Sequence, residues 1–219
     1  MTSSQPPLPT AAGQPAHDAG LADAVLAQWF GSARPDNATA LAHQAQWFTK
    51  SAAFDAALRE RFGAAVQAAL DGQLRHWAAQ GPWPCLALIL LLDQFTRNIH
   101  RGTPRSFAGD PQALALALEA QDRGLDLELP EVARIFMYLP LEHAEDMAMQ
   151  ERSVQAFQSL AQMAPDAASR EFLAGTLDYA YRHREVIARF GRFPHRNPIL
   201  GRASTPQESE YLAQPGSGF

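Results

Sequence analysis

The residues best equipped for chemistry lie in two stretches, LLDQFTRNIHRG at 91–102 and RHREVIARFGRFPHRNPILGR at 182–202. Both gather arginine, which recognises anions, and histidine, which transfers protons. The later stretch begins with a helical pattern and ends in a loop punctuated by glycine and proline, where functional side chains are common. The earlier one follows the most apolar run of the chain. Together they predict a polar, arginine-rich site within a helical protein.

Polar residues that interrupt apolar rows of predicted helices should point inward. His183 and Arg184 interrupt the rows of a helix predicted over 165–190, and His143 interrupts one predicted over 140–163. A buried arginine needs a carboxylate, carbonyl groups or a bound anion, because an unpaired buried charge is too costly.

Asp93 should also be at least partly buried. It follows Leu86 and Leu90 on one row of the apolar helix. We therefore predict that Asp93 is paired and that Arg184 is its partner across two helices. The alternative is a structural polar network that fixes helix register.

We expect these polar residues to converge in one pocket that binds an anion through charge-assisted hydrogen bonds. Arg182 and Arg189 are excluded, since with Asp178 and Glu185 they describe a solvated helix face. The candidates for proton transfer are His143, His183 and His195. The candidates for ligand binding are Asp93, Arg97, Asn98, Arg101, Glu142, Arg184, Arg192, Arg196 and Asn197.

Three classes of function fit this pattern. The favoured class is a binding protein for, or an enzyme acting on, a small anionic ligand such as a carboxylate or phosphate. The alternative is a scaffold that binds a protein or peptide and uses its polar residues only to organise its core. A metalloenzyme ranks last, because Glu142, His143, Asp146, His183 and His195 form no recognised metal motif. We therefore predict neither a metal site nor a cofactor.

Composition narrows the setting. The formal net charge is −5, so the basic surplus of a typical nucleic-acid-binding protein is absent and we predict no nucleic-acid partner. The apolar run CLALILLL is too short to cross a bilayer, so we predict no membrane association. A single cysteine, Cys85, excludes an intrachain disulfide and favours a reducing compartment. We expect a cytoplasmic protein.

The remaining pattern predicts an all-α fold. Residues 1–19, rich in proline, glycine, serine and alanine, should form a disordered leader, and 20–219 a single helical domain. The apolar helix predicted at 83–99 should lie at its centre, because it is apolar on every side. Thr205-Pro206-Gln207-Glu208 predicts a capping box that starts a short terminal helix.

Four segments carry a resemblance to a known family. They are WFTKSAAFDAALRERFGAAVQAALDGQLRHWA, LALILLLDQFTRNIHRGTPRSFAGDPQALALA, YLPLEHAEDMAMQERSV and HREVIARFGRFPHRNPILGRASTPQESEYL. They resemble the bacterial domain-of-unknown-function family 924 over roughly residues 24–213. The resemblance implies a fold similar to tetratricopeptide-like antiparallel helical arrays, and no activity or catalytic residue. His143 is followed here by Ala144 where serine is common in the family, which argues against a hydroxyl-dependent role at that position.

Overall fold

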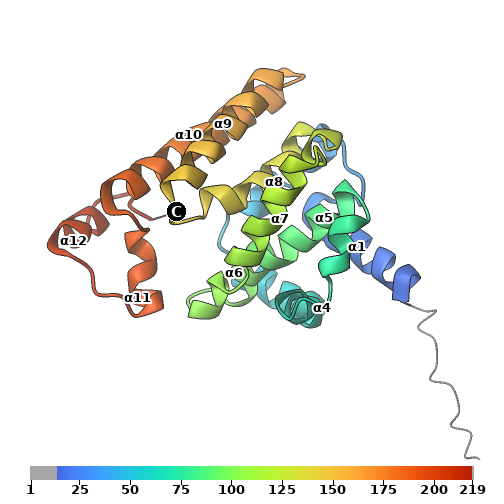
Figure 1. Cartoon of the computed structure of the whole chain (residues 1–219), viewed down its shortest axis with the longest axis horizontal. Helices are drawn as coiled ribbons and strands as arrows, with labels where there is room; N and C mark the ends of the chain where they lie inside the picture. Colours follow the sequence, from blue (N-terminus) through green and yellow to red (C-terminus); the bar gives the residue numbers. More distant parts are fainter. Residues whose placement is uncertain (1–13, 219) are drawn as a thin grey trace, which may run out of the picture.

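A computed structural model describes residues 14–218 and confirms the all-α class, with no strand among them. Figure 1 shows a helical body from which one long antiparallel pair, α9 and α10, extends to one side. The α-helices are α1 (Gln14–Phe30), α2 (Asn37–Leu41), α3 (Gln44–Trp47), α4 (Ala52–Leu70), α5 (Pro82–Ile89), α6 (Thr96–Ile99), α7 (Asp110–Asp122), α8 (Glu131–Glu142), α9 (Met147–Met163), α10 (Ala167–Phe190), α11 (Asn197–Leu200) and α12 (Pro206–Leu212). Four short 3₁₀-helical segments and one π-helical segment, η2, also occur: η1 (Arg75–Ala79), η2 (Leu90–Phe95), η3 (Pro104–Phe107), η4 (Asp126–Glu128) and η5 (Pro194–Arg196).

The predicted central helix is confirmed, with one change of geometry. It runs through α5, η2 and α6, and it packs against α1, α4, α7 and α8. The segment η2 is π-helical, so its backbone is wider than that of an α-helix. Such π-helical turns occur frequently at functional sites. The sequence did not indicate this turn.

A glycine allows close packing against this turn. A Cβ atom added at Gly109 would lie 2.2 Å from the carbonyl oxygen of Leu92, which no side chain can tolerate. The start of α7 therefore approaches the backbone of η2 directly. This contact brings Asp110 close to Asp93, as described below.

Caps fix several helix starts. Asp146 accepts a hydrogen bond from the backbone N–H of Met149 at the start of α9, and Asp166 does the same with Ser169 for α10. The predicted capping box of Thr205 and Glu208 is confirmed at α12.

One predicted helix boundary is wrong. Pro140 does not open a long helix; it lies in the last turn of α8, and the next helix begins only after the Asp146 cap. Pro140 lacks the N–H that would donate to the residue four positions earlier, but burial of its neighbours Leu139 and Leu141 favours the helical path. Helix α1 begins at Gln14, before the predicted start of the domain at residue 20.

The leader prediction otherwise falls on residues 1–13, outside the described residues. The single domain over 20–219 and the tetratricopeptide-like arrangement both stay predictions. Within residues 14–218, no helix is both long enough and apolar enough to cross a membrane.

Candidate functional site

A cleft of about 310 Å³ opens where α7, the end of α8, the α8–α9 connection and η5 meet. Its lining combines apolar and polar side chains. Its lining residues are Asp110, Pro111, Leu114, Pro140, His143, Ala144, Glu145, Asp146 and Arg196.

Asp93 and His143 form the innermost polar pair at this cleft. Asp93 is 0% exposed, as predicted, and its Oδ1 lies 2.7 Å from His143 Nδ1. Burial alone would raise the pKa of Asp93, but Arg97 and His143 hold it well below its usual range. An ionised carboxylate at this distance requires a proton on Nδ1, so the neutral ring presents the lone pair of Nε2.

The other nitrogen of His143 is therefore available for chemistry. Its ring lines the cleft, and Nε2 has no hydrogen-bond partner among residues 14–218. Burial and the charge of Arg97 lower the pKa of His143, although Asp93 opposes them. A neutral histidine held by a buried carboxylate is a suitable general base.

Two guanidinium groups share one carboxylate beside this pair. Arg97 donates to Asp93 Oδ1 at 2.8 Å and to both oxygens of Asp110, at 2.9 and 3.1 Å. Arg196 reaches the same Asp110 only at 3.3 Å. Asp110 is thus a common counter-ion for both arginines.

Arg196 is buried, with its guanidinium 4.7 Å from the ring centres of both Phe107 and Phe193. Its Nη2 donates to the carbonyl of His143 at 2.9 Å, and its Nε has no partner. Burial and the charge of Arg97 lower the pKa of Arg196 to about 10, so it stays charged at neutral pH. Since a guanidinium has five N–H donors, each terminal nitrogen keeps a second N–H.

A second buried pair lies behind His143. The Nδ1 of His183 lies 2.9 Å from the carbonyl of Tyr179 and 3.2 Å from Glu142 Oε1. Burial, followed by the charge of Asp93, raises the pKa of Glu142 to about 8. Burial lowers the pKa of His183 to about 3. Both groups are therefore neutral at pH 7.

The three candidate histidines do gather. The ring centres of His143 and His183 are 6.3 Å apart, and Phe193 lies between His183 and His195 at 5.4 and 5.6 Å. Burial and the charge of Arg196 lower the pKa of His195 to about 4. Of the predicted site residues, His143 and Arg196 line the cleft; Asp93, Arg97, Glu142, His183 and His195 lie near these two residues without lining it.

Arg184 does not join them, and its predicted pairing with Asp93 is wrong. Its Nε donates to Glu151 at 2.8 Å, and the side chain is 38% exposed. Ala180 and Ile187 of the same row are buried, but the long side chain of Arg184 reaches a partly exposed carboxylate on α9.

Four other candidates are bound into structural networks away from the cleft. Asn98 and Arg101 both donate to Asp55, at 2.8 Å and at 2.7 and 3.0 Å. Arg192 makes two hydrogen bonds to Glu208, at 2.6 and 2.8 Å, and buried Asn197 donates to Ser204. These contacts tie the four side chains to carboxylates or a hydroxyl of the protein away from the cleft.

Sequence reasoning missed Asp110 and Glu145. Asp110 precedes a proline, a pattern that indicates only a helix start, yet it bridges Arg97 and Arg196. Glu145 lies in the first turns of the helix predicted over 140–163, where a carboxylate is ordinary, yet it accepts from Phe193 N at 2.8 Å and from Arg202 at 2.6 and 2.8 Å. Neither residue stands out by spacing, because its partners come from distant segments.

These carboxylates also set the charge balance of the cleft. Its polar rim holds three carboxylates, Asp110, Glu145 and Asp146, beside the guanidinium of Arg196. Among the described residues, no group of three or more histidine, cysteine, aspartate or glutamate side chains is arranged to hold a metal ion.

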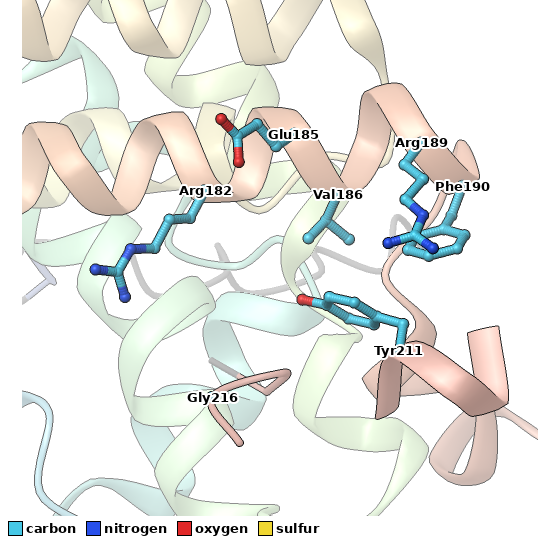
Figure 2. A pocket seen from close by; sticks show the side chains of 7 residues that line it. All are labelled: Arg182, Glu185, Val186, Arg189, Phe190, Tyr211 and Gly216. Atoms are coloured by element: carbon cyan, nitrogen blue, oxygen red, sulfur yellow. The ribbon is translucent and has the colours of Figure 1, made fainter. Parts of the chain in front are cut away.

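A second pocket, of about 230 Å³, lies away from this chemistry between α10 and the C-terminal segment. Figure 2 shows Val186 and Phe190 of α10 facing Tyr211 of α12, with Arg182 and Arg189 at the sides. Arg182 pairs with Asp178 at 2.6 Å, and both side chains are exposed. This is the solvated face that the sequence predicted.

Comparison with known proteins supports the fold and adds no activity. The model of a family described as bacterial proteins of unknown function (DUF924) matches residues 25–216. A solved structure of a protein of unknown function from Agrobacterium tumefaciens is 41% identical, with a TM-score of 0.74. That match covers 89% of this chain and 98% of the other. No curated protein matches the chain.

Proposed function

Because the chain belongs to the DUF924 family of bacterial proteins of unknown function, we propose its function from the cleft. The cleft binds a small anionic ligand, and His143 acts on that ligand as a general base. The observation that carries this proposal is the Asp93–His143 pair at the cleft. Asp93 occupies Nδ1, the His143 ring lines the cleft, and no hydrogen bond to a described residue occupies Nε2.

Arg196 supplies the attraction for the anion. It lines the cleft, its terminal nitrogens keep unused N–H donors, and it shares its counter-ion with Arg97. Two helix N-termini, those of α7 and α9, also contribute residues to the lining. Their partial positive charge adds to that of the guanidinium.

A protein-binding scaffold is the second candidate. Its supporting feature is the pocket of Figure 2, where Phe190 and Tyr211 lie 5.2 Å apart beside exposed arginines. A tetratricopeptide-like arrangement would suit that role. The scaffold function ranks second because no polar residue that lines this pocket is buried in the way that Asp93 and Arg196 are. A cytoplasmic location, expected from the lone cysteine, suits either role.

A thermal-shift screen of small metabolites of both charges tests the proposal. Ligands that bind the native state raise the Tm by mass action. The ligands that raise the Tm most should be anions, and the Tm shifts that they cause should be smaller in Arg196→Gln and His143→Asn. Arg182→Gln, on the solvated face, is the matched control and should leave these Tm shifts unchanged. If no anion gives a shift that depends on Arg196, the proposed function is wrong.

A further inference from the structure

The lining of the cleft is chemically mixed. Pro111 and Leu114 of α7, Pro140 of α8 and Ala144 supply its apolar surface, here called the apolar wall. His143, Arg196 and the rim carboxylates supply its polar groups. A ligand that complements both kinds of surface has an apolar body and a polar head.

The charges at the rim limit the charge of that head. Asp110, Glu145 and Asp146 line the cleft, and Arg196 is the cation that lines it. Both oxygens of Glu145 are taken by Phe193, Arg202 or both, and both oxygens of Asp110 by arginines. Their negative charge nevertheless remains, and like charges repel a ligand that carries about two negative charges, such as phosphate near pH 7. One guanidinium matches one negative charge.

The size of the cleft limits the ligand as well. A volume of about 310 Å³ lies at the small end of typical ligand pockets. It accommodates a short hydrocarbon chain but no nucleotide-sized molecule.

Resting on the proposed function, we infer that the ligand is a short-chain monocarboxylate. Its carboxylate would accept from the second N–H of Arg196 Nη1 and Nη2, as carboxylates commonly do with arginine. Its chain would lie against Leu114 and the prolines. The Nε2 of His143 would then face the ligand near its head group.

Isothermal titration of the full chain with sodium salts of acetate, butyrate, hexanoate and octanoate tests this inference. Each methylene that enters the apolar wall should tighten the Kd about threefold to fourfold, until the cleft is full. Hexanamide should bind more weakly than hexanoate, because it lacks the charge. Hexylamine, inorganic phosphate and succinate should bind more weakly still.

Leu114→Gln removes the apolar contact while keeping a helix-forming residue of similar length. It should abolish most of the gain with chain length and leave acetate unchanged. Leu118→Gln is the matched control, because Leu118 lies one turn further along α7 and does not line the cleft. The wild-type ligand series remains decisive if the Leu114 variant does not fold.

The outcomes separate this inference from the proposed function. If phosphate or succinate binds as tightly as hexanoate in an Arg196-dependent way, the cleft binds anions and the monocarboxylate inference is wrong. The same holds if affinity does not rise with chain length. If no anion binds in an Arg196-dependent way, the proposed function itself has failed.

Discussion

Two regions of this protein are rich in arginine, and they use it differently. In the C-terminal network each arginine has a carboxylate of its own, held through two short hydrogen bonds: Arg192 binds Glu208, and Arg202 binds Glu145, the residue at which this network meets the cleft. At the cleft, the lining residue Arg196 shares Asp110 with Arg97 behind it and reaches that carboxylate only at 3.3 Å.

The difference shows that arginine density does not mark a site by itself. A guanidinium with a dedicated carboxylate has little left to offer a ligand. A guanidinium that is buried, stacked between aromatic rings and incompletely neutralised still has donors to offer. His143 lines the same cleft as Arg196. We therefore assign function to the cleft and structure to the C-terminal network.

The largest loss of stability should come from breaking the centre of the cleft. Asp93→Ala leaves Arg97 and His143 without their buried partner, and it should lower the free energy of unfolding by about 3 kcal/mol or more. Chemical denaturation measures this value. Asp178→Ala, which removes an exposed partner of Arg182, is the control and should be nearly neutral. An equally small change for Asp93→Ala would mean that the inner pair does not exist.

Glu142 should give the cleft region a distinctive pH dependence. Its folded-state pKa of about 8 lies above the usual 4.5, so the folded protein keeps a proton that the unfolded chain releases. Wild-type stability is then lost as pH rises between these two values. Glu142→Gln has no such loss, so its stability relative to wild type should rise across that window and level off above it.

The gain should be on the order of 5 kcal/mol by pH 9, measured by denaturation at a series of pH values. Glu185→Gln, on the exposed face of α10, should show no such trend. A constant difference between Glu142→Gln and wild type from pH 4 to pH 9 would show that Glu142 is not protonated in the folded state.

A smaller effect should come from the C-terminal network. Glu208 caps α12, so Glu208→Ala should cost about 1 kcal/mol. Ligand affinity at the cleft should not change, since Arg192 and Glu208 do not line it. Titration with hexanoate and denaturation of the same variant check both statements. A large loss of affinity would mean that the two regions are not separate.

The smallest effect is expected for Arg184→Ala. Its ion pair with Glu151 is partly exposed, and such pairs contribute little. The change in unfolding free energy should stay within about 0.5 kcal/mol. A loss comparable to that of Asp93→Ala would restore the idea that Arg184 is a buried partner in the core.

The sequence predicted the all-α fold and the inward orientation of Asp93 and His143 for one reason. Asp93 and His143 interrupt apolar rows, and burial follows directly from helical periodicity. Periodicity misplaced Arg184, because it shows which residues share a face but not whether a long polar side chain on that face reaches an exposed partner, as Arg184 does with Glu151. The π-helical turn around Asp93 also has no periodic signature.

The placement of Asp110, Arg196 and Glu145 depends on contacts between segments far apart in the sequence, which no local pattern contains. Asp110 meets Arg196 across the whole C-terminal half of the chain, and only the close approach at Gly109 places it there. Glu145 meets Arg202 in the same way. A helix start that carries an aspartate is so common that its second role could not be read from composition.

The central claim is that His143 is a neutral base, with its proton on Nδ1 and Nε2 open to the cleft. Long-range ¹H–¹⁵N NMR of the full chain, with His143→Asn to assign the signal, tests it directly. At pH 7 we expect an unprotonated Nε2 beside a protonated Nδ1, and a clear shift of the Nε2 signal when hexanoate is added. A proton on Nε2 at pH 7 without ligand, or an Nε2 signal that saturating anions leave unmoved, would contradict the account.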